Sequence, residues 1–226
     1  MNYTIRMNEV SNPEKSVKAF VTVTFEDCFK VCNIAVVESR EGSLFVSMPS
    51  FKSKKRTEYN EPIYKEVCNP ITGEFRTQLY GDILALYEEM KETGLSEIVK
   101  EAKKKEELKF AVAVSPFERE GSNTRGLARI YLDDSFVISN VSILQGKETE
   151  FIAMPSYAVK QSFGNGRPSY QDVCYPTTKE FREKISNEIL TTYRQEKEKE
   201  RRTPSEENVP AGEHFYEVDD HELPLR

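Results

Sequence analysis

The sequence predicts an α+β fold built from two repeated units. The phrase "FVSMPS" at 45–50 returns as "FIAMPS" at 151–156. From Phe45 to Tyr87, 17 of 43 positions are identical to those 106 residues later, without a gap. Each copy also reads as segments of period two, typical of strands, followed by one segment of helical period. We therefore expect each unit to be an antiparallel β-sheet of about four strands packed by a C-terminal α-helix.

Four strands are predicted in the same order in each unit. The opening strands alternate at Tyr3, Ile5 and Met7, and at Phe110, Val112 and Val114. The second strand is clearest in "VKAFVTVTF" (17–25), where every second residue is apolar. An acidic turn, "EDC" or "DDS", leads into the third strand, where Phe29 and Asn33 correspond to Phe136 and Asn140 at an offset of 107. The repeated phrase itself is a fourth strand, which ends at Pro49 or Pro155 because proline cannot donate to a ladder.

The helix of each unit is predicted by residues spaced four apart, which form one apolar stripe facing the sheet. The stripes are Phe75, Leu79, Ile83 and Tyr87, and Phe181, Ile185, Ile189 and Tyr193. Thr72 and Thr178 suit the helix start, and Gly94 suits a helix end.

The resulting organisation is a first domain at 1–93, a helical or charged linker at 94–108, a second domain at 109–195 and a tail at 196–226. In the linker, Leu95, Ile98, Val99 and Ala102 favour a second short helix. The tail is charged, interrupted by proline and without periodicity, which predicts a helix fraying into disorder.

Composition narrows the function classes. No apolar run approaches the roughly 18 residues of a membrane span, charged residues make up 31%, and the mean hydropathy is −0.62. The start of the chain has no secretory-signal pattern, and four thiols in such a chain are typical of the reducing cytosol. We expect a cytoplasmic protein with no membrane partner. Most of the net charge of −6 lies beyond Glu196, where ten acidic residues accompany five basic ones, so the body is nearly neutral.

Catalytic and metal chemistry find little support in the residues. The two histidines, His214 and His221, lie in the tail, and no phosphate-loop, nucleophile-elbow or dinucleotide motif occurs. Cys28 and Cys32 have neither a second cysteine pair nor a histidine nearby, which argues against zinc. Cys68 and Cys174 occupy equivalent positions and are expected to be small buried residues. We expect no enzyme activity, no metal and no cofactor.

The segments "VKAFVTVTF", "FKVCNIAVVE", "GSLFVSMPS", "YKEVCNPI" and "FRTQLYGDILALY" resemble the SpoVG family, the stage V sporulation protein G or septation regulators. The resemblance covers about residues 1–90 and 109–195. Family members are small, usually single-copy regulators that dimerise and bind DNA and RNA. The resemblance implies that fusion supplies the dimer partner within the chain, as an intrachain pseudo-dimer that is either a monomer or a homodimer in solution.

The resemblance also locates nucleic-acid contacts in the loop after Met-Pro-Ser. The candidate site residues are Lys52, Lys54, Lys55 and Arg56 in copy 1, Lys160 and Arg167 in copy 2, and Arg76 and Arg182 at the helix starts. Cations of this kind suit phosphate. Tyr59 and Tyr64 offer stacking faces or pack within the fold. The family loop usually reads lysine-arginine-threonine-proline-aspartate-glycine, whereas this chain has "FKSKKRTEYNEP" and "YAVKQSFGNGRP".

Two hypotheses therefore stand. The first is a nucleic-acid-binding regulator made of two fused SpoVG-like domains. The second is a protein-interaction module that kept the fold and lost nucleic-acid binding, which the acidic net charge and the degenerate second loop favour.

Overall fold

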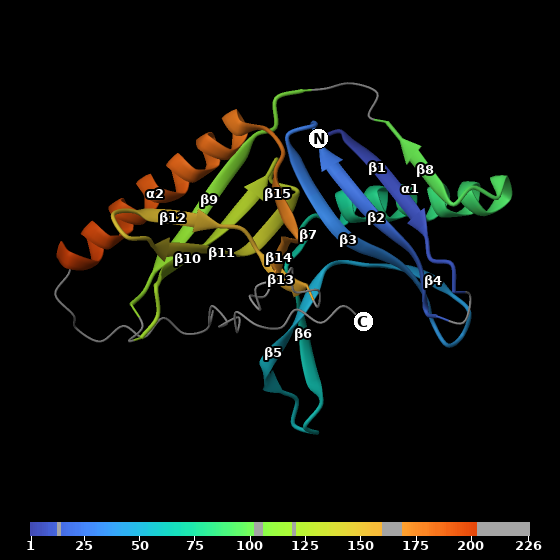
Figure 1. The fold of residues 1–226 in the computed structure, drawn as a ribbon, viewed down its shortest axis with the longest axis horizontal. Helices are drawn as coiled ribbons and strands as arrows, with labels where there is room; N and C mark the ends of the chain where they lie inside the picture. Colours follow the sequence, from blue (N-terminus) through green and yellow to red (C-terminus); the bar gives the residue numbers. More distant parts are fainter. Residues whose placement is uncertain (13–14, 102–105, 119–120, 160–168, 203–226) are drawn as a thin grey trace.

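The computed structural model describes residues 1–12, 15–101, 106–118, 121–159 and 169–202. Two similar halves lie side by side, each with a sheet and a long helix, α1 (Gly73–Thr93) or α2 (Lys179–Arg202) (Figure 1). The α+β class, the two repeated units and the pseudo-dimer arrangement predicted from the sequence are thus confirmed.

The four predicted strands are present in each copy and pair antiparallel with their sequence neighbours. In copy 1 they are β1 (Tyr3–Glu9), β2 (Val17–Phe25), β3 (Phe29–Glu38) and β4 (Leu44–Ser47). In copy 2 they are β9 (Phe110–Pro116), β10 (Thr124–Leu132), β11 (Phe136–Gln145) and β12 (Glu150–Ala153). The acidic turns join the second and third strands, with positive φ at Glu26 and Asp27 and at Asp133 and Asp134. The repeated phrase forms a strand end, as predicted.

The two copies exchange short strands, which the sequence did not predict. β7 (Cys68–Pro70) leaves copy 1 and pairs with β11 of copy 2, while β15 (Cys174–Pro176) leaves copy 2 and pairs with β3 of copy 1. Each exchanged strand precedes the helix of its own copy, and each helix packs mainly on its own sheet. The exchange therefore joins the two halves through backbone hydrogen bonds in both directions.

An asparagine lies in each strand that pairs with an exchanged strand, between the segments that pair with two different neighbours. Asn33 and Asn140 have φ values of 61° and 60°, in a left-handed conformation that asparagine tolerates better than most residues. Both lie where the pairing with the second strand shifts register, in a β-bulge. On one side of Asn33, β3 pairs with β15 of copy 2, and on the other side with its own β4. The bulge next to Asn33 also frees the Cys32 N–H to donate to the Val173 carbonyl (2.8 Å).

One hydrophobic core runs through both copies. The rings of Phe25 and Phe136 lie 5.0 Å apart, and Phe29 of copy 1 meets Phe181 on α2 edge-to-face at 6.5 Å. Phe25, Phe29 and Phe136 are fully buried. Because this contact is made by both halves, neither half buries its aromatic residues alone.

The helix predictions are confirmed. All eight residues of the two apolar stripes are buried. The Phe75 and Phe181 N–H groups donate to the Oγ1 atoms of Thr72 (3.3 Å) and Thr178 (3.2 Å), which cap the two helices. Gly94 ends α1 in the left-handed conformation. Within the part of the chain that the structure describes, no helix has the length and apolarity needed to cross a membrane.

The linker differs from its prediction. Instead of a short helix, the structure has the strand β8 (Glu97–Lys100), which pairs antiparallel with β1. β1 has an open edge, and Ile98 and Val99 are β-branched residues that suit a strand, so tertiary pairing overrides the apolar spacing. Ion pairs of Arg6 with Glu97 (3.1 Å) and of Lys100 with Asp82 (2.9 Å) fix this strand to copy 1. Helix α2 continues to Arg202, and the rest of the predicted tail lies outside the described residues.

Candidate nucleic-acid interface

The expected basic loop after Met-Pro-Ser is a β-hairpin. β5 (Ser50–Arg56) and β6 (Pro62–Glu66) pair with each other in a separate two-stranded sheet and project from the body (Figure 1). The hairpin turn is held by Thr57, whose N–H donates to the Glu61 carbonyl (2.9 Å) and whose Oγ1 accepts from the Glu61 N–H (3.0 Å). Asn60 supplies the left-handed residue that such a turn requires. The prediction of a loop was therefore wrong, since backbone pairing with a downstream segment decides it.

The base of the hairpin is anchored in the core and its outer half is exposed. Phe51 and Ser53 are 2% and 6% exposed, whereas the described residues from 55 to 62 are exposed. The pairing shifts register between Lys52 and Arg56, where β5 carries two more residues than β6. This bulge contains the cationic stretch, and bulges re-aim side chains away from the regular pleat.

Three of the four predicted cations of copy 1 are thereby displayed together. Lys52, Lys55 and Arg56 are exposed on β5, and Lys52 lies directly opposite Tyr64 on β6. Arg56 donates from Nη1 to the Asn60 carbonyl (2.9 Å), which steadies the guanidinium beside the turn. The backbone of Lys54 belongs to the same strand. The hairpin thus presents several cations on one short, ordered element.

The equivalent element of copy 2 is β13 (Ser156–Val159) paired with β14 (Ser169–Asp172). Lys160 and Arg167, the predicted cations of this copy, lie outside the described residues. The described strands of this pair carry no lysine or arginine. Among the described residues, the copy 1 hairpin therefore carries cations and the strand pair of copy 2 does not.

Arg76 and Arg182 have structural partners. Arg76 Nη2 donates to the Pro70 carbonyl (3.0 Å), and Arg182 Nη2 donates to the Pro176 carbonyl (3.3 Å), so each arginine holds the end of its own exchanged strand. Burial raises the pKa of Glu66 and of Asp172, and the neighbouring arginine opposes that shift in each copy. These contacts explain why the arginine recurs in both copies; a phosphate contact by either one stays a prediction.

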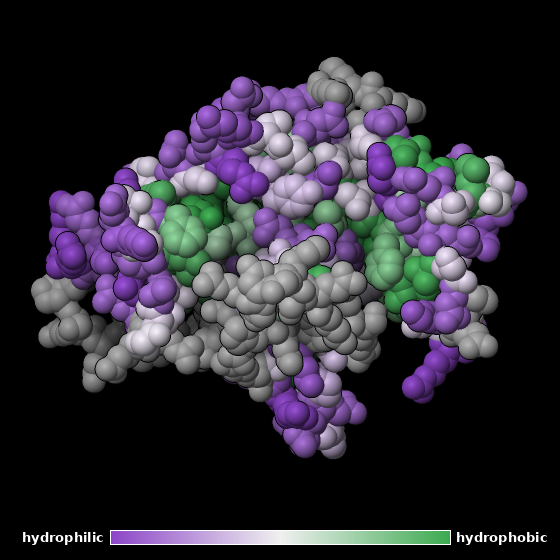
Figure 2. Space-filling model, in the orientation of Figure 1, coloured by the Kyte–Doolittle hydropathy of each residue, from purple (hydrophilic) through white to green (hydrophobic). Residues whose placement is uncertain are grey.

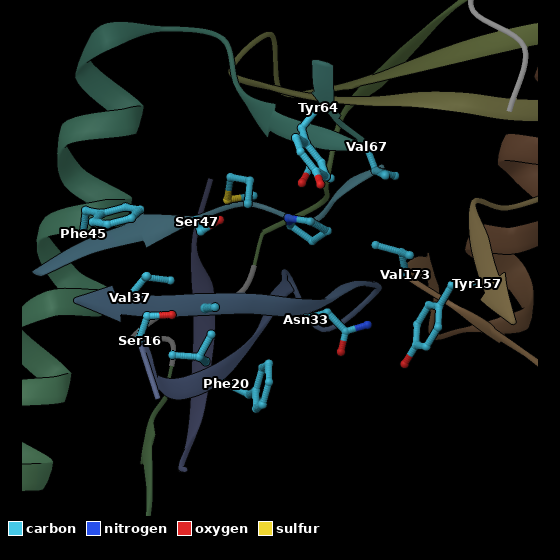
Figure 3. Close-up of a pocket in the computed structure, with 15 residues that line it drawn as sticks. Ser16, Phe20, Asn33, Val37, Phe45, Ser47, Tyr64, Val67, Tyr157 and Val173 are labelled. Carbon is cyan, nitrogen blue, oxygen red and sulfur yellow. The ribbon is translucent and has the colours of Figure 1, made fainter. Parts of the chain in front are cut away.

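A cleft of about 350 Å³ lies beside the hairpin, on the face of copy 1 opposite its core (Figure 3). Phe20 of β2, Phe45 of β4 and Tyr64 of β6 line it, with exposed fractions of 40%, 45% and 36%. Tyr157 and Val173 of copy 2 close one end, and Phe45 lies at the other. Asn33 also lines the cleft, so the bulge residue between the two paired halves of β3 faces this space. Among the residues that the structure describes, none that lines the cleft is charged.

The four cysteines are free thiols, two of them buried and two half-buried. Burial raises the pKa of Cys28 to about 11 and also raises that of Cys32, which keeps both thiols protonated near neutral pH. Cys68 and Cys174 are fully buried, as predicted, and lie close together. A hydrogen bond with Cys68, together with burial, raises the pKa of Cys174. Among the described residues, no group of three or more His, Cys, Asp or Glu side chains is arranged to hold a metal ion.

Two cleft residues could have been identified from the sequence, but the strand prediction considered only the inward-facing apolar residues. Phe20 and Phe45 fall on the outward phase of strands whose other phase, with Ala19, Val21 and Val46, builds the core. Two aromatic residues on the outward phase of one sheet could have indicated an exposed apolar patch. The contribution of Tyr157 was beyond reach, since it depends on how the two copies dock.

Comparison with known proteins agrees with this architecture. The model of the SpoVG family matches residues 1–89 and 109–195. Curated relatives carry the name "Putative septation protein SpoVG". The protein of Treponema denticola is 37% identical over 84 residues, which cover 37% of this chain and 82% of the relative. That of Clostridium perfringens (strain 13) is 39% identical over 98 residues, 43% of this chain and 100% of the relative. Each relative thus corresponds to a single copy, and this chain belongs to the SpoVG family as a member with two tandem copies of the family domain.

Proposed function

We propose that this protein is a cytoplasmic, non-enzymatic regulator that binds DNA or RNA, with hairpin β5–β6 of copy 1 as its main contact to phosphate. The observation that carries this proposal is the display of Lys52, Lys55 and Arg56 on an ordered element that stands away from the body. Ammonium and guanidinium groups in such a position displace the counterions condensed on a nucleic-acid backbone. The net charge of −6 does not oppose this, because most of it belongs to the residues beyond Glu196.

The alternative function is protein interaction without nucleic acid. The exposed aromatic residues of the cleft, Phe20 and Phe45, favour it, as does the sparse basic content of the copy 2 loop. The observed fold is compatible with both functions, so the charged side chains must distinguish them. The cluster of cations on β5 favours nucleic-acid binding, because a protein partner would not require it.

The test is fluorescence anisotropy of the full chain with labelled duplex DNA, single-stranded DNA and RNA pools. At about 50 mM salt, phosphate contacts are strong, and the logarithm of affinity falls linearly with the logarithm of salt concentration. We expect binding with a clearly negative salt slope. Absence of binding to all pools at that salt concentration would reject the proposal in favour of a protein-interaction module.

We further propose that the chain acts as a monomer, because the exchanged strands β7 and β15 already give each copy a partner. Light scattering on the sample used for binding should give the mass of one chain, 26.1 kDa. A mass of two chains at micromolar concentration would contradict this.

A further inference from the structure

We propose that the cleft of copy 1 is a base-binding site, so that the nucleic acid held by the hairpin is single-stranded and inserts unpaired bases among Phe20, Phe45 and Tyr64. This inference rests on the proposed function and specifies the ligand class of the same surface.

The cleft lining is rich in exposed aromatic rings. Phe20 and Phe45 of the copy 1 sheet and Tyr64 of the hairpin are each more than a third exposed. Exposed aromatic faces are what single-strand-binding sheets offer to bases, because every base has a π-face. The volume of about 350 Å³ lies at the small end of the range for small-molecule sites, which suits one or two bases rather than a helix.

Charge is placed beside the cleft rather than in it. The described lining residues are uncharged, while cations lie next to them on the hairpin. Lys52 lies directly opposite Tyr64, and Tyr64 forms part of the cleft wall, so phosphate contact and base contact are adjacent on one strand pair. Figure 2 shows the end of the hairpin as hydrophilic and a hydrophobic surface over the sheet of copy 1. An uncharged aromatic surface suits the base of a nucleotide, and the neighbouring cations of the hairpin suit its phosphate.

Asn33 adds a polar side chain to the cleft lining. Its amide carries two donors and one acceptor group, lines the cleft, and makes no hydrogen bond within the part of the chain that the structure describes. Such a group can bond to the edge of an unpaired base. A duplex keeps its base faces and Watson–Crick edges internal, so the aromatic rings of the cleft could not stack on its bases.

Copy 2 provides a matched control within the same chain. There Leu127 (7% exposed) replaces Phe20, while Phe151 (49% exposed) and Tyr170 (46% exposed) correspond to Phe45 and Tyr64. The surface of copy 2 therefore lacks one of the three aromatic faces, and its described hairpin strands lack cations. We place the base site in copy 1 for this reason.

The experiment compares four labelled probes of about 12 nucleotides, within the usual length of single-strand sites. They are single-stranded DNA, single-stranded RNA, a duplex of the same sequence, and an abasic strand that keeps the phosphates without bases. The unmodified protein should bind the single strands at least about tenfold more tightly than the abasic strand. The double variant Phe20→Leu with Phe45→Leu, which keeps apolar volume, should lose roughly five- to 100-fold of single-strand affinity. Its affinity for the abasic strand and its salt slope should not change.

Two control variants sharpen the result. Phe151→Leu should change single-strand affinity by less than about twofold. Asn33→Gly keeps the left-handed backbone while removing the amide, and should weaken single strands without affecting the abasic strand; Asn140→Gly is its equivalent in copy 2. Circular dichroism confirms that each variant is folded.

The outcomes separate this inference from the proposed function. If all four probes bind equally and the Phe20 and Phe45 variant is unaltered, the base site is rejected while nucleic-acid binding stands, and the cleft then belongs to a protein partner. If duplex binds more tightly than single strands, the base site is likewise rejected. If no probe binds, both proposals fall together.

Discussion

The two copies share an interior and differ in surface. Residues that hold the halves together recur at equivalent positions: Phe29 and Phe136, Asn33 and Asn140, Cys68 and Cys174, Arg76 and Arg182. The hairpins differ, with five basic residues between 50 and 66 and only two between 156 and 172. The third aromatic face of the cleft, Phe20, is leucine in copy 2. Duplication thus retained what the joint core and the strand exchange require, while the surfaces diverged.

The edges of the two sheets differ as well. β8 covers the edge of β1, whereas β9 is an edge strand among the described residues. The long α2 instead carries an ion pair from Lys197 to Glu118 (3.1 Å), just beyond the end of β9. A fused pseudo-dimer predicts an interior that is constrained to be similar in both copies and a surface that is not. Three sets of variants test this difference.

The largest effect is expected in the shared core. Phe136→Ala removes the ring that meets Phe25 across the copies and should lower the free energy of unfolding by about 3–5 kcal/mol. Phe29→Ala, its equivalent in copy 1, should cost a similar amount. Urea unfolding followed by far-UV circular dichroism and by tyrosine fluorescence should show one coincident transition for both variants. Two separate transitions would show that the halves fold independently.

The second effect tests the difference between the hairpins. Replacing Lys54, Lys55 and Arg56 with alanine should flatten the slope of log affinity against log salt by about 2 to 3 units on duplex DNA, and weaken all sequences alike. Replacing Lys160 and Arg167 should change the slope less. Alanine at Lys109 and Lys147, exposed cations outside the hairpins, serves as the charge control.

An unchanged slope and affinity in the copy 1 variant would remove the hairpin from the phosphate contacts. A loss confined to one preferred sequence in the copy 2 variant, with its slope unchanged, would instead assign base reading to that copy.

The smallest effect concerns alkaline stability, which is specific to copy 1. Burial, followed by the hydrogen bond from Tyr3 to Asp82 (2.7 Å), raises the pKa of Tyr3 above its ordinary value near 10. The unfolded chain therefore loses this proton at lower pH than the folded chain. The folded state binds more protons above about pH 10, so the free energy of unfolding falls as pH rises through that value. Copy 2 has Phe110 at the equivalent position.

Tyr3→Phe makes copy 1 resemble copy 2 at this position. The variant should lose roughly 1 kcal/mol at pH 7, the usual contribution of one hydrogen bond, and its free energy of unfolding should fall less steeply above pH 10. Some decline remains, because burial raises the pKa of Tyr80 to about 12. Urea titrations at pH 7 and near pH 10.5 measure both effects, and equal alkaline slopes in the two proteins would contradict the assignment to Tyr3.

The sequence alone determined the repeat, the four strands and the helix of each copy, the threonine caps and the buried faces. These features are local, because strand and helix periods and cap chemistry act over a few residues. It also located the cationic stretch, although not its form as a hairpin. The sequence gives the type of each side chain directly, but it does not show that residues 50–56 pair with residues 62–66.

Only the tertiary structure decided which strands pair over long distances. Cys68–Pro70 and Cys174–Pro176 are too short to be recognised as strands, and each gains its ladder from the other copy. Residues 97–100 became a strand rather than a helix because the edge of β1 was open to pairing. The cleft likewise depends on the docking of the copies, because Phe20 and Phe45 of one copy line it together with Tyr157 of the other. Such features depend on the docking of distant segments, whose free energy is shared among many contacts and is not encoded in any local pattern.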